Sequence, residues 1–176
     1  MSLQHSYQAL AEQESIDIPT GWLQGRTIYG GLVAGLMMQK ALLTLADDTK
    51  HLLSCSVTFV GPVQQAKVRL TSEILRQGKS VTTLEVRLWQ DDAVQSILVA
   101  SFGTQRESSI HVHQEPVAPA FPSVDGLTTA PHHPLAPECF KQLDMVWVTG
   151  QYPCTASPKP DFSGWYRFNP DSHENR

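Results

Sequence analysis

Two adjacent glycines, Gly30 and Gly31, stand directly before a long apolar stretch that ends at Ala46. If this stretch is a helix, the glycines lie at its N-terminus. Unpaired N–H groups and the positive end of the helix dipole there stabilise negative charge on a carbonyl oxygen. Glycine has no Cβ, so a ligand could approach the backbone closely. The same pair could equally serve a tight strand-to-helix turn or close packing, and the sequence leaves both interpretations open.

Gln39 is the one polar residue on an apolar leucine stripe of this predicted helix. A glutamine amide can orient a water molecule, but it cannot act as a general base. No carboxylate lies between residues 31 and 46, and Asp47 and Asp48 fall at the opposite end, by the negative pole. Gln39 is therefore a candidate catalytic residue, and a hydrogen-bonded core or interface glutamine is the favoured alternative.

The composition excludes several classes of protein. The 176 residues are 41% apolar and 17% charged, with a formal net charge of −4. This apolar content excludes an intrinsically disordered chain, and the negative charge excludes a nucleic-acid binder that works by bulk charge. The three cysteines, Cys55, Cys139 and Cys154, show no CxxC spacing. They predict neither a disulfide framework nor a zinc site, and they favour reduced thiols in a cytoplasmic protein.

Targeting and metal-binding patterns are equally weak. The N-terminus has no basic start followed by an apolar run, so no secretory signal is predicted. The apolar stretch 32–46 is too short and too polar to span a bilayer. Histidines at 111, 113, 132 and 133 lack the carboxylate or cysteine spacing of a metal site. We therefore expect a solvated loop there, with no metal and no cofactor.

The elements that must position these residues follow from periodicity. The stretch Gly30–Ala46 is apolar nearly all round, which predicts a helix buried on all sides. Period-two alternation predicts strands at 52–60, 66–76 and 81–90, and a more uniformly apolar strand at 94–102. Residues 77–79 and 91–92 are short hairpin connections. We expect an α+β fold in which an antiparallel meander is covered by the long helix.

The C-terminal third differs from the rest of the sequence in its proline content. Six prolines fall within 22 residues, at positions 116, 119, 122, 131, 134 and 137, and they predict an extended linker. Two further strands are expected at 140–148 and 165–168. The predicted division is therefore a first unit at 1–106, a proline-rich linker at 107–138, and a smaller unit at 139–176.

Four motifs in the first unit resemble those of the double-hotdog acyl-CoA thioesterases. Residues 22–31, WLQGRTIYGG, are similar to the W-x-x-G-R-x-x-[FYH]-G-G entry to the helix in that family. Residues 56–62, SVTFVGP, resemble its S-x-x-F-x-x-P strand. Residues 74–80, ILRQGKS, resemble its L-R-x-G-[RK]-S hairpin, and residues 99–102, VASF, resemble its A-S-F strand end. The order and the spacing of all four agree with the family.

The resemblance implies a hotdog fold, in which an antiparallel sheet wraps a long buried helix. It also implies hydrolysis of acyl-CoA to a free fatty acid and CoA, without metal or prosthetic group. Two such units are fused in the family, so residues 139–176 would be the opening strands of an incomplete second unit. The family's catalytic Asp, Thr and Gln belong to that second unit and would lie beyond Arg176. None of these three catalytic roles is therefore assigned to a residue of this sequence.

The resemblance also suggests roles in the first unit. The thioester would lie near Gly30 and Gly31, with the acyl chain along the apolar helix at Leu36. Arg26 and Tyr29, which flank the glycines, would meet a CoA phosphate or cap the acyl tunnel; packing is the favoured alternative for Tyr29. Thr104 occupies the place that matches the family's strand-end glutamine.

Two other functions stay open. The missing helix carboxylate favours a non-catalytic acyl-CoA-binding or oligomerisation half of a double-hotdog protein. Dehydratase or hydratase chemistry ranks last, because its expected Asp/His pair is absent. Since a solitary hotdog sheet would expose apolar surface, we expect a homo-oligomer that associates through the sheets.

Overall fold

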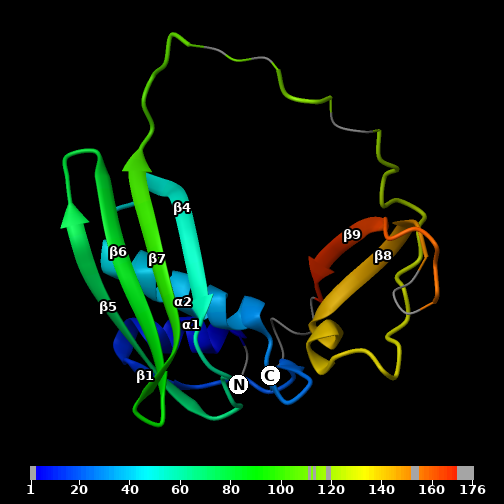
Figure 1. Ribbon diagram of the computed structural model, residues 1–176, viewed down its shortest axis with the longest axis horizontal. Coiled ribbons are helices and arrows are strands. Elements are labelled where there is room, and N and C mark those ends of the chain that lie inside the picture. The colour runs from blue at the N-terminus through cyan, green and yellow to red at the C-terminus, as the bar shows by residue number, and fades with distance from the viewer. Residues whose placement is uncertain (1–2, 111, 113, 118–119, 152–154, 170–176) are drawn as a thin grey trace.

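The computed structural model describes residues 3–110, 112, 114–117, 120–151 and 155–169 (Figure 1). Two helices, nine strands and one 3₁₀ helix form within these residues. In chain order they are α1 (Leu3–Glu12), β1 (Ser15–Asp17), β2 (Leu23–Gln24), β3 (Thr27–Ile28), α2 (Gly30–Leu45), β4 (Lys50–Phe59), β5 (Lys67–Gln77), β6 (Val81–Gln90), β7 (Ala93–Thr104), the 3₁₀ helix Glu138–Gln142, β8 (Leu143–Thr149) and β9 (Ser163–Phe168).

The main sheet is antiparallel, with the strand order β1-β5-β6-β7-β4. The expected meander is therefore correct only for β5, β6 and β7, because β4 crosses to the far side and pairs with β7. The predicted short connection between β6 and β7 is confirmed. Asp91 and Asp92 both have positive φ, 50° and 59°, as the tight turn of a two-residue hairpin requires. Figure 1 shows this sheet wrapped around α2.

Helix α2 buries one face rather than its whole circumference. The buried side chains are Leu32, Val33, Leu36, Met37 and Ala41. Leu42 and Leu43, however, are 46% and 38% exposed, so the prediction of a helix buried on all sides was wrong. The reason is that α2 packs on β5, β6 and β7 with one face and on α1 with part of another. The remaining apolar flank has no cover among the described residues.

Helix α1 was not predicted from the sequence, although the signal is present. Leu3, Tyr7 and Leu10 recur at intervals of three and four residues. Leu3 and Leu10 are buried, and the hydroxyl of Tyr7 lies 3.0 Å from the position that a Cβ on Gly35 would take. Partial burial raises the pKa of Tyr7. The glycine thus lets α1 pack closely on α2.

The C-terminal segment folds back onto the first unit. Between residues 105 and 137 the described residues form no helix or strand, and Figure 1 shows this connection arching from β7 across to β8. The strand expected from 140 begins only at Leu143, because the preceding turn is a 3₁₀ helix. Cys139 is buried in the main core, and the Gln142 side chain donates a hydrogen bond to the carbonyl oxygen of Gly21 at 3.1 Å.

Among the described residues, no helix combines the length and the apolar character needed to cross a membrane.

Candidate functional site

The N-terminus of α2 begins at Gly30, directly after Tyr29, as the sequence predicts. No side chain caps this end. The Tyr29 carbonyl oxygen accepts hydrogen bonds from the N–H groups of Leu32 at 3.0 Å and Val33 at 3.3 Å. The N–H groups of Gly30 and Gly31 have no acceptor among the described residues. Two backbone donors at the positive end of the helix are therefore available to a carbonyl oxygen.

Two aromatic rings flank these donors. The ring of Phe59, at the end of β4, lies 3.1–3.7 Å from the position that a Cβ on Gly30 would occupy. On the other side, the ring of Tyr29 folds over Gly31 and would collide with a Cβ there. The Tyr29 ring also stacks on buried Trp22, with ring centroids 6.4 Å apart and an interplanar angle of 14°. A side chain at Gly31 would therefore displace the Tyr29 ring, whereas one at Gly30 would only crowd Phe59.

Strand β4 extends an uncovered apolar surface away from this end of the helix. It is an edge strand, paired only with β7 among the described strands. Its register places Leu52, Cys55, Val57 and Phe59 opposite the helix-facing residues of β7. Helix α2 packs on the three other long strands, and Leu52 and Phe59 remain about half exposed. Burial nevertheless raises the pKa of the Cys55 thiol.

The remaining predicted site residues do not all converge on the helix N-terminus. Leu36 has no exposed surface and belongs to the core, where an acyl chain could reach it only after rearrangement. Gln39 is half-buried on the flank of α2 and has no side-chain hydrogen bond among the described residues. Arg26 lies in the exposed turn between β2 and β3, where it makes no ion pair with any described residue.

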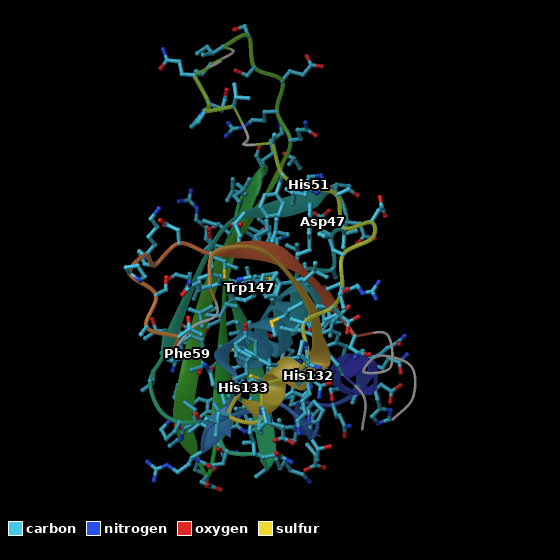
Figure 2. All side chains as sticks on the ribbon, turned by 90° about the vertical axis from the view of Figure 1, so that its right-hand side faces the viewer. Asp47, His51, Phe59, His132, His133 and Trp147 are labelled. Atoms are coloured by element: carbon cyan, nitrogen blue, oxygen red, sulfur yellow. The ribbon has the colours of Figure 1, made fainter. Side chains whose placement is uncertain are left out.

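Thr104 lies at the far end of the sheet. It pairs with Lys50 at the first residue of β4, whereas Phe59 and Gly30 meet at the last. At about 3.3 Å per residue, the length of β4 separates the two positions by roughly 30 Å. Figure 2 shows the same separation, with Asp47 and His51 at one end of β4 and Phe59 at the other. Thr104 and the glycines therefore cannot contact one small ligand together in this unit.

A charged cluster occupies the Thr104 end. Lys50, whose side chain is only 7% exposed, lies 3.2 Å from an Asp47 carboxylate oxygen and donates to Thr82 Oγ1 at 3.0 Å. The side chain of Thr49 donates to Asp47 at 2.6 Å, and its backbone N–H does so at 3.1 Å. These hydrogen bonds, led by the Thr49 hydroxyl, hold the pKa of Asp47 below its ordinary value. The cluster ends α2 and stabilises the start of β4.

One buried polar residue beside Phe59 was missed in the sequence. Ser96, on β7, is fully buried, and its hydroxyl has no hydrogen-bond partner among the described residues. It lies directly opposite Phe59 in the register of β4 and β7. The alternation along β7 could have revealed it, because Ser96 lies on the same buried face of the strand as Leu98, Ala100 and Phe102.

The described residues contain no group of three or more potential metal ligands. His132 and His133 are exposed (Figure 2), and His133 Nδ1 accepts a hydrogen bond from the N–H of Leu135 at 3.2 Å. His111 and His113 lie outside the described residues.

Comparison with solved structures identifies the fold. A hotdog-fold protein of unknown function from Alicyclobacillus acidocaldarius superposes with a TM-score of 0.73 at 20% identity, over 89% of this chain and 57% of that one. An acyl-CoA thioesterase II, TesB2, from Mycobacterium marinum superposes with a TM-score of 0.59 at 25% identity, over 79% and 50%. The chain thus spans about half the length of these structures. The fold is a hotdog fold, α+β, as predicted.

The family follows from the sequence of the same region. Residues 18–104 match the family described as the acyl-CoA thioesterase N-terminal domain. Through this hotdog domain, the chain is a member of the thioesterase-like family. No curated protein sequence matches it.

Proposed function

We propose that this chain is an acyl-CoA thioesterase unit that binds the thioester carbonyl at the N-terminus of α2. The observation that carries the proposal is the pair of unpaired N–H groups at Gly30 and Gly31. A thioester under attack develops negative charge on its carbonyl oxygen, and fixed backbone donors stabilise that charge without reorganising. The family of residues 18–104 supports this substrate class.

Hydrolysis also needs an activated water, and helix α2 carries no carboxylate that could act as the base. No carboxylate lies between Gly30 and Leu45, and Asp47 is held at the opposite end of α2. Gln39 can orient a water molecule, but it cannot accept its proton. The proposal therefore places the general base outside α2, on a residue of a second hotdog unit that faces this one.

Strand β4 is the proposed site of that pairing. Its ten residues offer unpaired backbone groups along one side, and its helix-facing side chains are apolar and, apart from the half-buried Val57, exposed. Such an edge pairs readily with another extended strand. A second copy of this chain, paired antiparallel along β4, would bury the apolar face and the exposed flank of α2. The proposed assembly is thus a homo-oligomer joined through its sheets.

Steady-state release of CoA from acyl-CoAs of several chain lengths tests the activity, with binding measured in parallel on the same protein. We expect turnover that falls by at least tenfold in Gly31→Ala, because the new Cβ displaces Tyr29 and crowds the donors. Turnover that is unchanged in this variant would remove the helix N-terminus from the mechanism. Gln39→Ala tests whether its amide orients the water.

A second candidate is an acyl-CoA-binding half without hydrolytic activity of its own. The absence of a carboxylate on α2 favours it. Acyl-CoA binding by a folded oligomer, with no release of CoA above background, would select this alternative.

A further inference from the structure

We propose that the Ser96 hydroxyl is a further hydrogen-bond donor to the acyl carbonyl oxygen, which it shares with a backbone N–H at the start of α2. This inference rests on the function proposed above. It begins from a buried polar group that the fold does not use: Ser96 has no exposed surface, and its Oγ has no partner among the described residues. A buried hydroxyl without a partner costs free energy, so a bound ligand or water is its expected partner.

The register of the sheet places this hydroxyl beside Phe59, whose ring reaches the helix N-terminus. Ser96 and Phe59 are directly opposite each other on β7 and β4, where Cβ atoms lie about 4.5–5.5 Å apart on the same face. That face is the one toward α2, because Leu98, Ala100 and Phe102 of the same phase are buried in the core. The Phe59 ring in turn contacts Gly30. Ser96, Phe59 and Gly30 therefore form one layer.

Phe59 controls access to this layer. Its side chain is 56% exposed at the end of an edge strand, so few contacts hold the ring against Gly30. When the ring rotates outward, it uncovers the Gly30 backbone and the Ser96 hydroxyl together. A carbonyl oxygen that enters this space has two lone pairs, and it can accept one hydrogen bond from a backbone N–H and one from Ser96.

The consequence is a division of roles between two donors. The helix N–H groups are fixed by the backbone, and the hydroxyl can rotate to follow the oxygen as its charge grows. Because Ser96 makes no other hydrogen bond among the described residues, its removal should not weaken the fold. The residue is expected to trade stability for ligand recognition.

Binding of two CoA analogues, one ketone and one thioether, tests the proposal directly. The first probe is the ketone analogue of hexanoyl-CoA, with a methylene group in place of the thioester sulfur, which keeps the carbonyl and is not hydrolysed. The second is S-hexyl-CoA, which lacks the carbonyl. We expect Ser96→Ala to weaken binding of the ketone about tenfold, the effect of one hydrogen bond, and to leave S-hexyl-CoA unchanged. The melting temperature of Ser96→Ala should equal or exceed that of wild type.

Ser101→Ala is the matched control. Ser101 lies on the same strand but on the opposite face, where it is hydrogen-bonded to Thr83 at 2.9 Å. This variant should bind both probes as wild type does and melt slightly lower. If Ser96→Ala binds the ketone unchanged, or loses both probes equally, the hydroxyl does not contact the carbonyl and the inference is wrong. If folded wild type binds neither probe, the proposed function itself fails, and this inference fails with it.

Discussion

The side-chain amide of Gln142 occupies the space that a Cβ on Gly21 would need. Gln142 Nε2 lies 2.5 Å from that position and donates to the Gly21 carbonyl oxygen at 3.1 Å. Gly21 has a φ of +87°, which a residue with a side chain rarely adopts. Next to it, Trp22 contacts Phe168 of β9, with ring centroids 6.4 Å apart. One short segment thus fastens the C-terminal hairpin to the hotdog domain.

Gly21→Ala should lower the free energy of unfolding by about 2–3 kcal/mol, because it combines an unfavourable φ with a collision against Gln142. Urea denaturation followed by tryptophan fluorescence measures the loss. Gly25→Ala is the control, since Gly25 also has a positive φ, +71°, but no atom near its Cβ position. That variant should lose only about 1 kcal/mol. Equal losses would show that the Gln142 contact contributes nothing.

Gly31→Ala should separate the Tyr29 ring from Trp22, because the new Cβ collides with that ring. We expect a changed near-UV circular dichroism spectrum at unchanged helix content. Gly35→Ala makes the same substitution one turn later, where it meets only the Tyr7 hydroxyl. Its effect on the tryptophan signal should be small. A near-UV spectrum of Gly31→Ala identical to wild type would contradict the stacking.

Self-association along β4 predicts a dimer by light scattering. Val57→Lys places a charge on the helix-facing side of the edge strand and should yield monomers, because that charge would be buried in the dimer. Val99→Lys, on the outer face of β7, carries the same charge and should stay dimeric. A wild-type monomer, or a Val57→Lys dimer, would rule out this interface.

Disulfide cross-linking provides an independent measurement of the same pairing. Cys55 is exposed near the middle of β4, so an antiparallel pair centred on the strand brings two copies of it together. In a Cys154→Ser background, mild oxidation should produce a covalent dimer. The thiol should react slowly below its raised pKa, so the oxidation is run at high pH. Absence of the cross-link would mean another register or another surface.

Asp47→Asn should lower the melting temperature at neutral pH and have no effect in strong acid. The folded pKa of Asp47 lies below its ordinary value of 3.8, so its stabilising contribution is complete above that value and disappears as the pH falls through the folded pKa. Melting curves across this pH range measure the difference. Asp48→Asn removes the neighbouring charge without these hydrogen bonds, and it should follow wild type at every pH.

Much of the local structure was predictable because it depends on local chemistry. The paired glycines marked the first residue of α2, and alternation marked the long strands to within two or three residues. The acidic pair 91–92 marked the hairpin. Alternation records that one face of a strand is buried, but it does not record which neighbour the strand pairs with. The pairing of β4 with β7 could therefore not be predicted from the alternation.

The site was only partly predictable for a similar reason. Sequence proximity brought Tyr29 and the glycines together, and the structure keeps them together. Phe59 and Ser96 join them through the register of two strands that are distant in sequence. Ser96 could have been noticed in the sequence as a polar residue among the apolar residues of one strand face. That Thr104 lies at the other end of the sheet depends on topology alone.

The burial of Cys139 in the main core has a consequence for synthesis. Cys139 packs among side chains of the first unit, and Gln142 bonds Gly21, 121 residues earlier. Phe168 is synthesised long after Trp22, so the Trp22 ring gains this contact only after residue 168 has left the ribosome. Residues that are synthesised much later than the main sheet thus complete its core.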